Sequence, residues 1–142
     1  MSEILFQNHV LTRAPQQRLQ TILSNPETLR LWDNEITQIA AVGNGVDITR
    51  QAPALNTHEH LTVTASANQV IYHSQDGNLA YQLTFTLSGV DNQTTLTETL
   101  TVPATAGNLV PLNLLAPIAK HAFAQKLAAL VALAESDWEV SD

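Results

Sequence analysis

The sequence predicts a single α+β domain in which a seven-stranded, curved antiparallel sheet wraps around one long C-terminal helix, with two short helices between the first two strands. The first observation behind this prediction is that apolar residues alternate with period two along seven segments. The second is that turn residues separate most of these segments at short, regular intervals. The third is that residues 112–135 are apolar around most of a helical circumference, so other structure must cover that helix.

The first strand and the two short helices are predicted within residues 3–32. Residues 3–12 alternate as a strand, with three apolar residues on one face: Ile4, Phe6 and Val10. Pro15 opens the first helix at a position where its missing N–H is harmless. The second begins at residues 24–27, Ser-Asn-Pro-Glu, where a capping side chain, a proline and an acidic residue coincide. Trp32 lies at its end.

Six further strands are predicted to form an antiparallel meander after these helices. Their expected bounds are 36–42, 46–51, 57–65, 69–75, 79–88 and 94–102. The connection at residues 76–78, Asp-Gly-Asn, has Gly77 available for a positive backbone φ. Short connections of this kind join neighbouring antiparallel strands.

The terminal helix is predicted over residues 112–135. Its densest apolar stripe comprises Ala116, Ala119, Phe123, Leu127, Leu130 and Leu133 or Ala134. Pro117 falls inside this pattern, so the helix either begins or kinks there. The acidic residues after 135 are expected to fray. The chain contains no internal repeat or linker, which predicts one domain over residues 1–142.

The composition limits the classes of function. Of the 142 residues, 44% are apolar and only 13% are charged, so Thr, Gln, Asn and Ser must cover much of the surface. The formal charge is -7 and no run of Lys or Arg interrupts it, which excludes nucleic acid and anionic membranes as favoured partners. No cysteine is present, so disulfides and zinc-thiolate sites are excluded.

The expected location is the cytoplasm. The first nine residues lack a basic region followed by an apolar run, so we expect no secretory signal or transit peptide. The most apolar segment, residues 109–134, is interrupted by polar residues and is too polar to insert stably into a membrane as a lone helix.

Three segments carry a resemblance to a known superfamily. Residues 10–15, Val-Leu-Thr-Arg-Ala-Pro, lead from a strand into a helix; residues 25–29, Asn-Pro-Glu-Thr-Leu, precede Trp32; and residues 115–118, Leu-Ala-Pro-Ile, begin the closing helix. In these features, over nearly its full length, the chain resembles the START-like and birch pollen allergen-like superfamily, often called SRPBCC, and in particular its polyketide cyclase/dehydrase branch. The resemblance implies a helix-grip fold with a cavity between sheet and helix. Relatives use that cavity for lipids, sterols, polyketides or plant hormones, while some are enzymes and others bind proteins.

Glu98 is the most informative polar residue in the sequence. Period two places it on the apolar face of the strand 94–102. Inside an apolar cavity its pKa would rise, and the carboxyl could act as a general acid or base or could anchor a ligand hydroxyl. The alternative is a structural hydrogen bond or ion pair near the mouth of the cavity, with Arg13 or Arg30 as partner.

Two further strands place titratable side chains near the expected cavity. In strand 57–65, Glu59 faces inward and His58 and His60 face outward, and because this histidine pair has no third ligand we predict no metal site. In strand 69–75, the pattern leaves open whether Tyr72 or His73 faces inward. Whichever does could form, with Tyr81, a polar end of an apolar pocket.

We therefore expect a protein that binds or carries a small hydrophobic ligand, lipid-like or polyketide-like, between sheet and terminal helix. The residues expected to contact the ligand are Phe6, Trp32, Tyr81, Phe85, Glu98, Ala119 and Phe123. One alternative is a polyketide cyclase/dehydrase-like enzyme that uses Glu98 with His73 or Tyr72 in acid/base chemistry. Another is a co-chaperone-like domain that binds a partner protein. No glycine-rich cofactor loop is present, so no cofactor is expected. The protein could be a monomer or a homodimer.

Overall fold

The computed structural model describes residues 2–52, 54–90, 92–103 and 112–136 and confirms the predicted fold class. Its seven strands are β1 (Ser2–Thr12), β2 (Ile36–Val42), β3 (Gly45–Arg50), β4 (His58–Ala65), β5 (Gln69–Gln75), β6 (Tyr81–Val90) and β7 (Gln93–Pro103). The helices are α1 (Gln16–Ser24), the 3-10 helix η1 (Pro26–Thr28), α2 (Leu29–Trp32) and α3 (Leu112–Glu135). The expected loop before residue 112 and the end of the chain after residue 136 lie outside the described residues.

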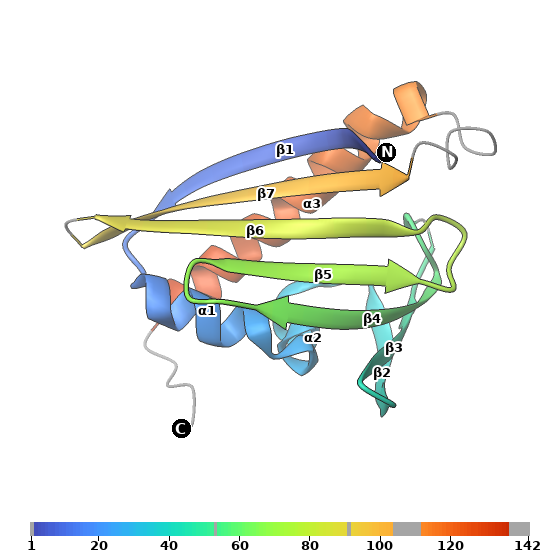
Figure 1. Ribbon diagram of the computed structural model, residues 1–142, viewed down its shortest axis with the longest axis horizontal. Coiled ribbons are helices and arrows are strands. Elements are labelled where there is room, and N and C mark those ends of the chain that lie inside the picture. The colour runs from blue at the N-terminus through green and yellow to red at the C-terminus, as the bar shows by residue number, and fades with distance from the viewer. Residues whose placement is uncertain (1, 53, 91, 104–111, 137–142) are drawn as a thin grey trace.

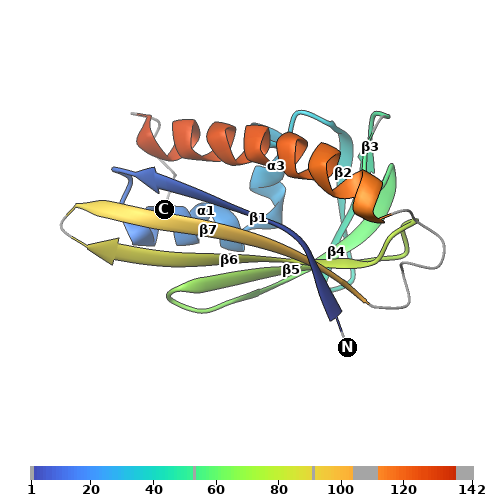
Figure 2. The same cartoon turned by 90° about the horizontal axis from the view of Figure 1, so that it is seen from above.

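All neighbouring strands are antiparallel, in the order β1-β7-β6-β5-β4-β3-β2. The first strand therefore pairs with the last, while the other strands form a meander (Figure 1). Figure 2 shows the helices on one side of the curved sheet, with α3 running along the strands. The core lies between that concave face and the helices, as expected for a sheet with one apolar face.

A β-bulge near the start of β1 corrects one expectation about its inward face. Ile4 pairs with Thr101, but Phe6 pairs with the next residue of β7, Leu100, so β1 carries one extra residue between them. The insertion reverses the alternation, since a slip of one residue moves each side chain to the opposite face. Ile4 is thus 65% exposed, whereas Phe6 and Asn8 are buried.

The hairpin connection between β5 and β6 differs from its predicted chemistry. The positive φ falls on Asp76, at 68°, and not on Gly77. Gly77 is required for a different reason, because a Cβ at this position would lie 2.7 Å from the Asn56 side chain and 2.7 Å from the carbonyl oxygen of His58. This close approach brings the connection before β4 against the connection before β6.

The helices begin near the predicted signals. Pro15 immediately precedes α1, and the Asn25 side chain accepts a hydrogen bond of 3.1 Å from the backbone N–H of Glu27 at the start of η1. Helix α3 already begins at Leu112, so Pro117 lies inside it and does not start it. Its buried apolar stripe consists of Ala119, Phe123, Leu127, Leu130 and Ala134.

The C-terminal end of α3 is held against the start of the chain. Thr12 donates a hydrogen bond of 2.6 Å to the Glu135 carboxylate, and the backbone N–H of Arg13 donates another of 3.1 Å. Arg18 donates from Nε to the carbonyl oxygen of Ala134 at 2.7 Å, which satisfies one of the free carbonyls at the helix end. These contacts fix one end of α3 over the sheet.

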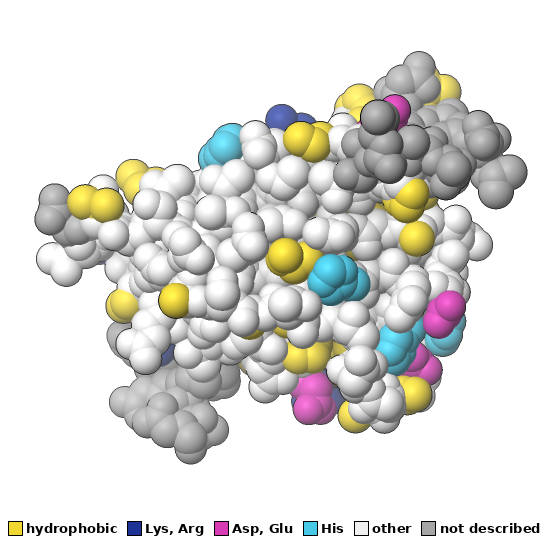
Figure 3. All heavy atoms as spheres, in the orientation of Figure 1, with side chains coloured by type: hydrophobic (Ala, Val, Ile, Leu, Met, Phe, Trp, Pro, Cys, Tyr) yellow, Lys and Arg dark blue, Asp and Glu magenta, His cyan; other side chains and the backbone are white. Residues whose placement is uncertain are grey.

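The outer face of the sheet is mainly uncharged and polar, as Figure 3 shows. Threonines on β6 and β7 face each other there in register, for example Thr84 with Thr99 and Thr86 with Thr97. The expected coverage of the surface by uncharged polar residues is thus seen on this face. Within the described part of the chain, no helix is long and apolar enough to cross a bilayer.

Candidate functional site

Two spaces lie beside α3, one between it and the concave face of the sheet and one between it and the connections before β4 and β6, and Phe123 lines both. The first, here called the inner void, has a volume of about 20 Å³ and is lined from β3, β4, β5, β6, β7, α2 and α3. The second, here called the outer pocket, has a volume of about 350 Å³. Its apolar walls are Ala54, Leu55, Leu79, Leu115, Ile118, Ala119, Ala122 and Phe123.

The inner void has room for about one water molecule, so the interior under α3 is largely filled by side chains. Of the seven residues predicted to contact a ligand, four line this void: Trp32, Tyr81, Glu98 and Phe123. Ala119 lines the outer pocket instead, together with Phe123. The predicted residues are therefore divided between two spaces.

The other two, Phe6 and Phe85, line neither space and pack against neighbouring rings. The ring centroids of Phe6 and Phe123 are 5.1 Å apart. Phe85 contacts Tyr72 edge-on at 5.3 Å and Trp32 at 6.3 Å. Such tilted and edge-on contacts are favourable for aromatic rings, and here they fill the volume that a larger cavity would need.

Glu98 is buried at the inner void, on the face that its strand position predicts. Asn8, its direct partner across the β1–β7 pair, donates from Nδ2 to Oε1 at 2.9 Å and also to the carbonyl oxygen of Lys120 in α3 at 3.2 Å. Burial raises the pKa of Glu98 to about 7, although the Asn8 hydrogen bond and the charge of Lys126 lower it. This carboxyl group therefore gains or loses its proton near neutral pH.

The expected partners Arg13 and Arg30 do not contact Glu98. Arg13 follows the end of β1 and donates its backbone N–H to Glu135, and Arg30 is exposed. The amide of Asn8 takes their place because the register of β1 against β7 sets it directly opposite Glu98. The identity of this neighbour depends on the register between β1 and β7, which the alternation of apolar residues does not predict.

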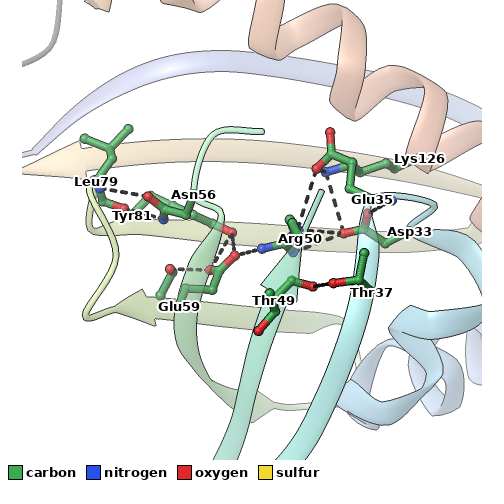
Figure 4. Close-up of polar contacts among 11 residues, drawn as sticks. Asp33, Glu35, Thr37, Thr49, Arg50, Asn56, Glu59, Leu79, Tyr81 and Lys126 are labelled. Carbon is green, nitrogen blue, oxygen red and sulfur yellow. Dashed lines mark hydrogen bonds and ion pairs between the residues drawn. The ribbon is translucent and has the colours of Figure 1, made fainter. Parts of the chain in front are cut away.

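Five charged residues form what we call the buried ion cluster, shown in Figure 4: Asp33, Glu35, Arg50, Glu59 and Lys126. Arg50 donates to Asp33 at 3.0 Å and forms an ion pair with Glu59. Lys126 from α3 donates to Glu35 at 2.7 Å. The cluster thus joins the end of α2, strands β3 and β4, and α3.

Glu59 is fully buried and is held by three donors. Arg50, Ser74 and the hydroxyl of Tyr81 all contact its carboxylate, with Tyr81 at 2.9 Å. Its inward direction agrees with the alternation of its strand. Burial raises the pKa of Tyr81, so its hydroxyl keeps its proton and donates.

Arg50 and Lys126 are not among the site residues predicted from the sequence, although each has a recognisable signal in the sequence. Arg50 shares the inward face of β3 with Val46 and Ile48, which are buried. Lys126 lies beside Leu127 in the apolar stripe of α3 and is itself buried. A cation on an apolar face calls for a buried carboxylate partner, and that rule would have pointed to both residues.

The structure resolves the open choice in β5, because Tyr72 faces inward and His73 faces outward. The Tyr72 hydroxyl donates to the carbonyl oxygen of Leu23 at 2.7 Å, and burial raises its pKa. His73 lies near Thr64 on the outer face of the sheet, 3.3 Å from its hydroxyl. Glu98 and Tyr72 therefore line the same void, whereas the sheet separates Glu98 from His73.

The two outward histidines of β4 have different surroundings. His60 contacts Asp47 at 2.7 Å, and His58 is exposed. Among the residues that the structure describes, no group of three or more His, Asp or Glu side chains is placed to hold a metal ion.

One wall of the outer pocket is formed by two connections that the Asn56 side chain joins. The buried Asn56 side chain donates to the carbonyl oxygen of Leu79 at 2.7 Å and accepts from its backbone N–H at 2.8 Å. This pair of bonds resembles a strand contact and holds Leu55 and Leu79 opposite α3. A polar contact thus positions this wall, whose surface toward the pocket is mainly apolar, with Asn78 as its polar residue.

Comparison with solved structures confirms the helix-grip architecture. A START superfamily protein from Mycobacterium smegmatis superposes with a TM-score of 0.76 and 17% identity, covering 92% of this chain and 96% of that one. Norcoclaurine synthase from Thalictrum flavum, in complex with dopamine and hydroxybenzaldehyde, superposes with a TM-score of 0.70 and 12% identity, covering 99% of this chain and 90% of that one. The di-domain ARO/CYC protein of the steffimycin biosynthetic pathway superposes with a TM-score of 0.71 and 12% identity, covering 92% of this chain and 50% of that one.

These likenesses place the chain in the START-like fold class and confirm the resemblance seen in the sequence at the level of the fold. No protein-family model and no curated protein matches the sequence. Because the identities are below 20%, activity does not transfer with the fold.

Proposed function

We propose that this protein binds a small, mainly apolar molecule in the outer pocket between α3 and the two connections joined by Asn56. The observation that carries the proposal is the apolar pocket of about 350 Å³, which lies within the size range of small-molecule sites. Ile118 is 70% exposed at this pocket, so a ligand would remove apolar surface from water at about 25 cal/mol per Å².

The position of the pocket next to charged groups supports a ligand with a polar end. Glu35 lines the outer pocket and accepts the hydrogen bond from Lys126, which lines the inner void. Sites for small molecules combine mainly apolar walls with a few fixed polar groups in this way. The ligand site we propose is therefore nearer the surface than the enclosed cavity expected from the sequence.

A cyclase-like enzyme is a second candidate, favoured by the pKa of Glu98. A carboxyl that exchanges its proton near neutral pH suits acid/base chemistry. Of the two partners predicted for Glu98, only Tyr72 lines the inner void, and its hydroxyl already donates to the carbonyl oxygen of Leu23. A void of about 20 Å³ also holds no substrate unless Phe123 moves, so binding is the function that the geometry supports better.

Filling the outer pocket should weaken ligand binding. In Ala122→Trp the new ring would occupy the space that the half-buried Ala122 leaves beside Phe123, and we expect the affinity for a fluorescent naphthalene probe to fall at least about tenfold. Ala128→Trp, at an exposed position of the same helix, is the matched control and should bind as the wild type does. Equal affinities in the two variants, or no saturable binding by the wild type, would rule the outer pocket out.

A further inference from the structure

Most polar groups that line the inner void already have partners within the protein. The hydroxyls of Tyr72 and Tyr81 donate to Leu23 and Glu59 respectively. The cations Arg50 and Lys126 are shared among carboxylates of the buried ion cluster. These groups therefore need nothing from an occupant of the void.

Two lining groups are left without a partner among the described residues. Trp32 is only 5% exposed, and its Nε1–H, a donor, has no acceptor. Glu98 accepts from Asn8 at Oε1, but no side chain or backbone group donates to Oε2. An unsatisfied buried donor costs free energy, so a polar occupant beside Trp32 would be stabilising. Both residues line a space of about 20 Å³, the size of one water molecule.

The charges around the void disfavour an ionic occupant of either sign. Four charged side chains line the void, the acidic Asp33 and Glu98 and the basic Arg50 and Lys126, so the lining carries no excess charge that would compensate a buried anion. An ammonium group would meet the N–H of Trp32 and the two cations that line the void. What remains is a small neutral group that can both accept and donate.

We infer that the inner void takes the hydroxyl oxygen of an alcohol or phenol whose apolar body lies in the outer pocket. A hydroxyl accepts from Trp32 Nε1–H through one lone pair and donates its proton to Glu98 Oε2. It also matches Glu98 in the protonated state, because the hydroxyl can then accept instead. In the free protein a single water would serve the same two groups. This inference rests on the proposed function.

Phe123 gives the two spaces a common wall, so a ligand in the outer pocket can extend its hydroxyl past this ring. The ring lies against Phe6, with centroids 5.1 Å apart, and beneath the ammonium of Lys126, 4.4 Å from the ring centroid. Changes of side-chain rotamer on binding are common in pockets that are otherwise formed. Such binding requires the Phe123 ring to rotate, which would join the outer pocket to the void.

The inference is tested by comparing 2-naphthol with 2-methylnaphthalene, which has nearly the same shape but no hydroxyl. We expect the wild type to bind 2-naphthol roughly tenfold more tightly, as one or two net hydrogen bonds would give. In Trp32→Phe, which removes the donor, the ratio of the two affinities should fall toward one. In a spectroscopic test on the wild type, the indole N–H resonance of Trp32 should shift with 2-naphthol and much less with 2-methylnaphthalene.

The outcomes separate this inference from the proposed function. Saturable binding of both compounds with equal affinity, and an unmoved Trp32 resonance, would overturn the hydroxyl site and leave the outer pocket intact as a binding site. Saturable binding of neither compound would overturn both. Because the resonance is measured on the wild type, the test stands even if Trp32→Phe does not fold.

Discussion

Replacing Arg50 with methionine should lower the free energy of unfolding by about 3–5 kcal/mol, since it leaves the buried carboxylate of Glu59 without its cation. Arg50 is 8% exposed and contacts Asp33, Glu35 and Glu59 at once. Methionine preserves most of the side-chain volume, so the loss would reflect the charge and not a cavity. Glu59 would suffer most, because it is fully buried and would keep only hydroxyl donors.

Urea unfolding at pH 7, followed by far-UV circular dichroism, gives the measurement. Arg30→Met is the matched control, because Arg30 is exposed and its replacement should change the stability by less than about 0.5 kcal/mol. A loss below about 1 kcal/mol in Arg50→Met would mean that the buried ion cluster does not hold the end of α2, β3 and β4 together.

Glu98→Gln should stabilise the protein at pH 8 by up to about 3 kcal/mol and leave its stability nearly unchanged at pH 4. The pKa of Glu98 is about 7 in the folded state against 4.5 for an ordinary glutamate. Between these values the folded state binds more protons than the unfolded state, so stability falls as the pH rises from about 4.5 to about 7. Glutamine carries no charge and retains an oxygen that can accept from Asn8.

The test is the difference in unfolding free energy between variant and wild type at pH 4, 6 and 8. Taking the difference cancels the titration of other groups. Glu3→Gln, at an exposed position of β1, is the control and should show a nearly constant difference across this range. If Glu98→Gln also differed from the wild type by a constant amount, or lost stability at pH 8, Glu98 would not be a buried carboxyl with a raised pKa.

The fold could be predicted because its signals are local or depend only on alternation. The strands β2 and β5 and the helix α3 have the expected bounds, since each carries a clear hydrophobic period between turn or loop residues. Ile4 was placed on the wrong face because a β-bulge has no signature in a single apolar run. The positive φ was predicted at Gly77 and lies at Asp76, because both residue types are common in turns and the sequence does not distinguish them.

The site was only partly predictable because it depends on contacts between distant segments. Alternation placed Glu98 and Glu59 inward, as the structure has them. The cluster around Arg50 needs residues from α2, β3, β4 and α3, which no spacing in the sequence brings together. The extent of the cavity was also hidden, because it depends on how the rings of Phe6, Phe85 and Phe123 pack.

Two-dimensional NMR of the ¹⁵N-labelled protein during a titration with 2-naphthol tests the central claim most directly. A small apolar molecule in the outer pocket should shift the amide resonances of Leu55, Leu79, Ala119 and Phe123 in a saturable manner. Resonances on the outer face of the sheet, such as that of Thr99, should stay in place. Shifts confined to that outer face, or no saturable shift at all, would contradict binding between α3 and the connections that Asn56 joins.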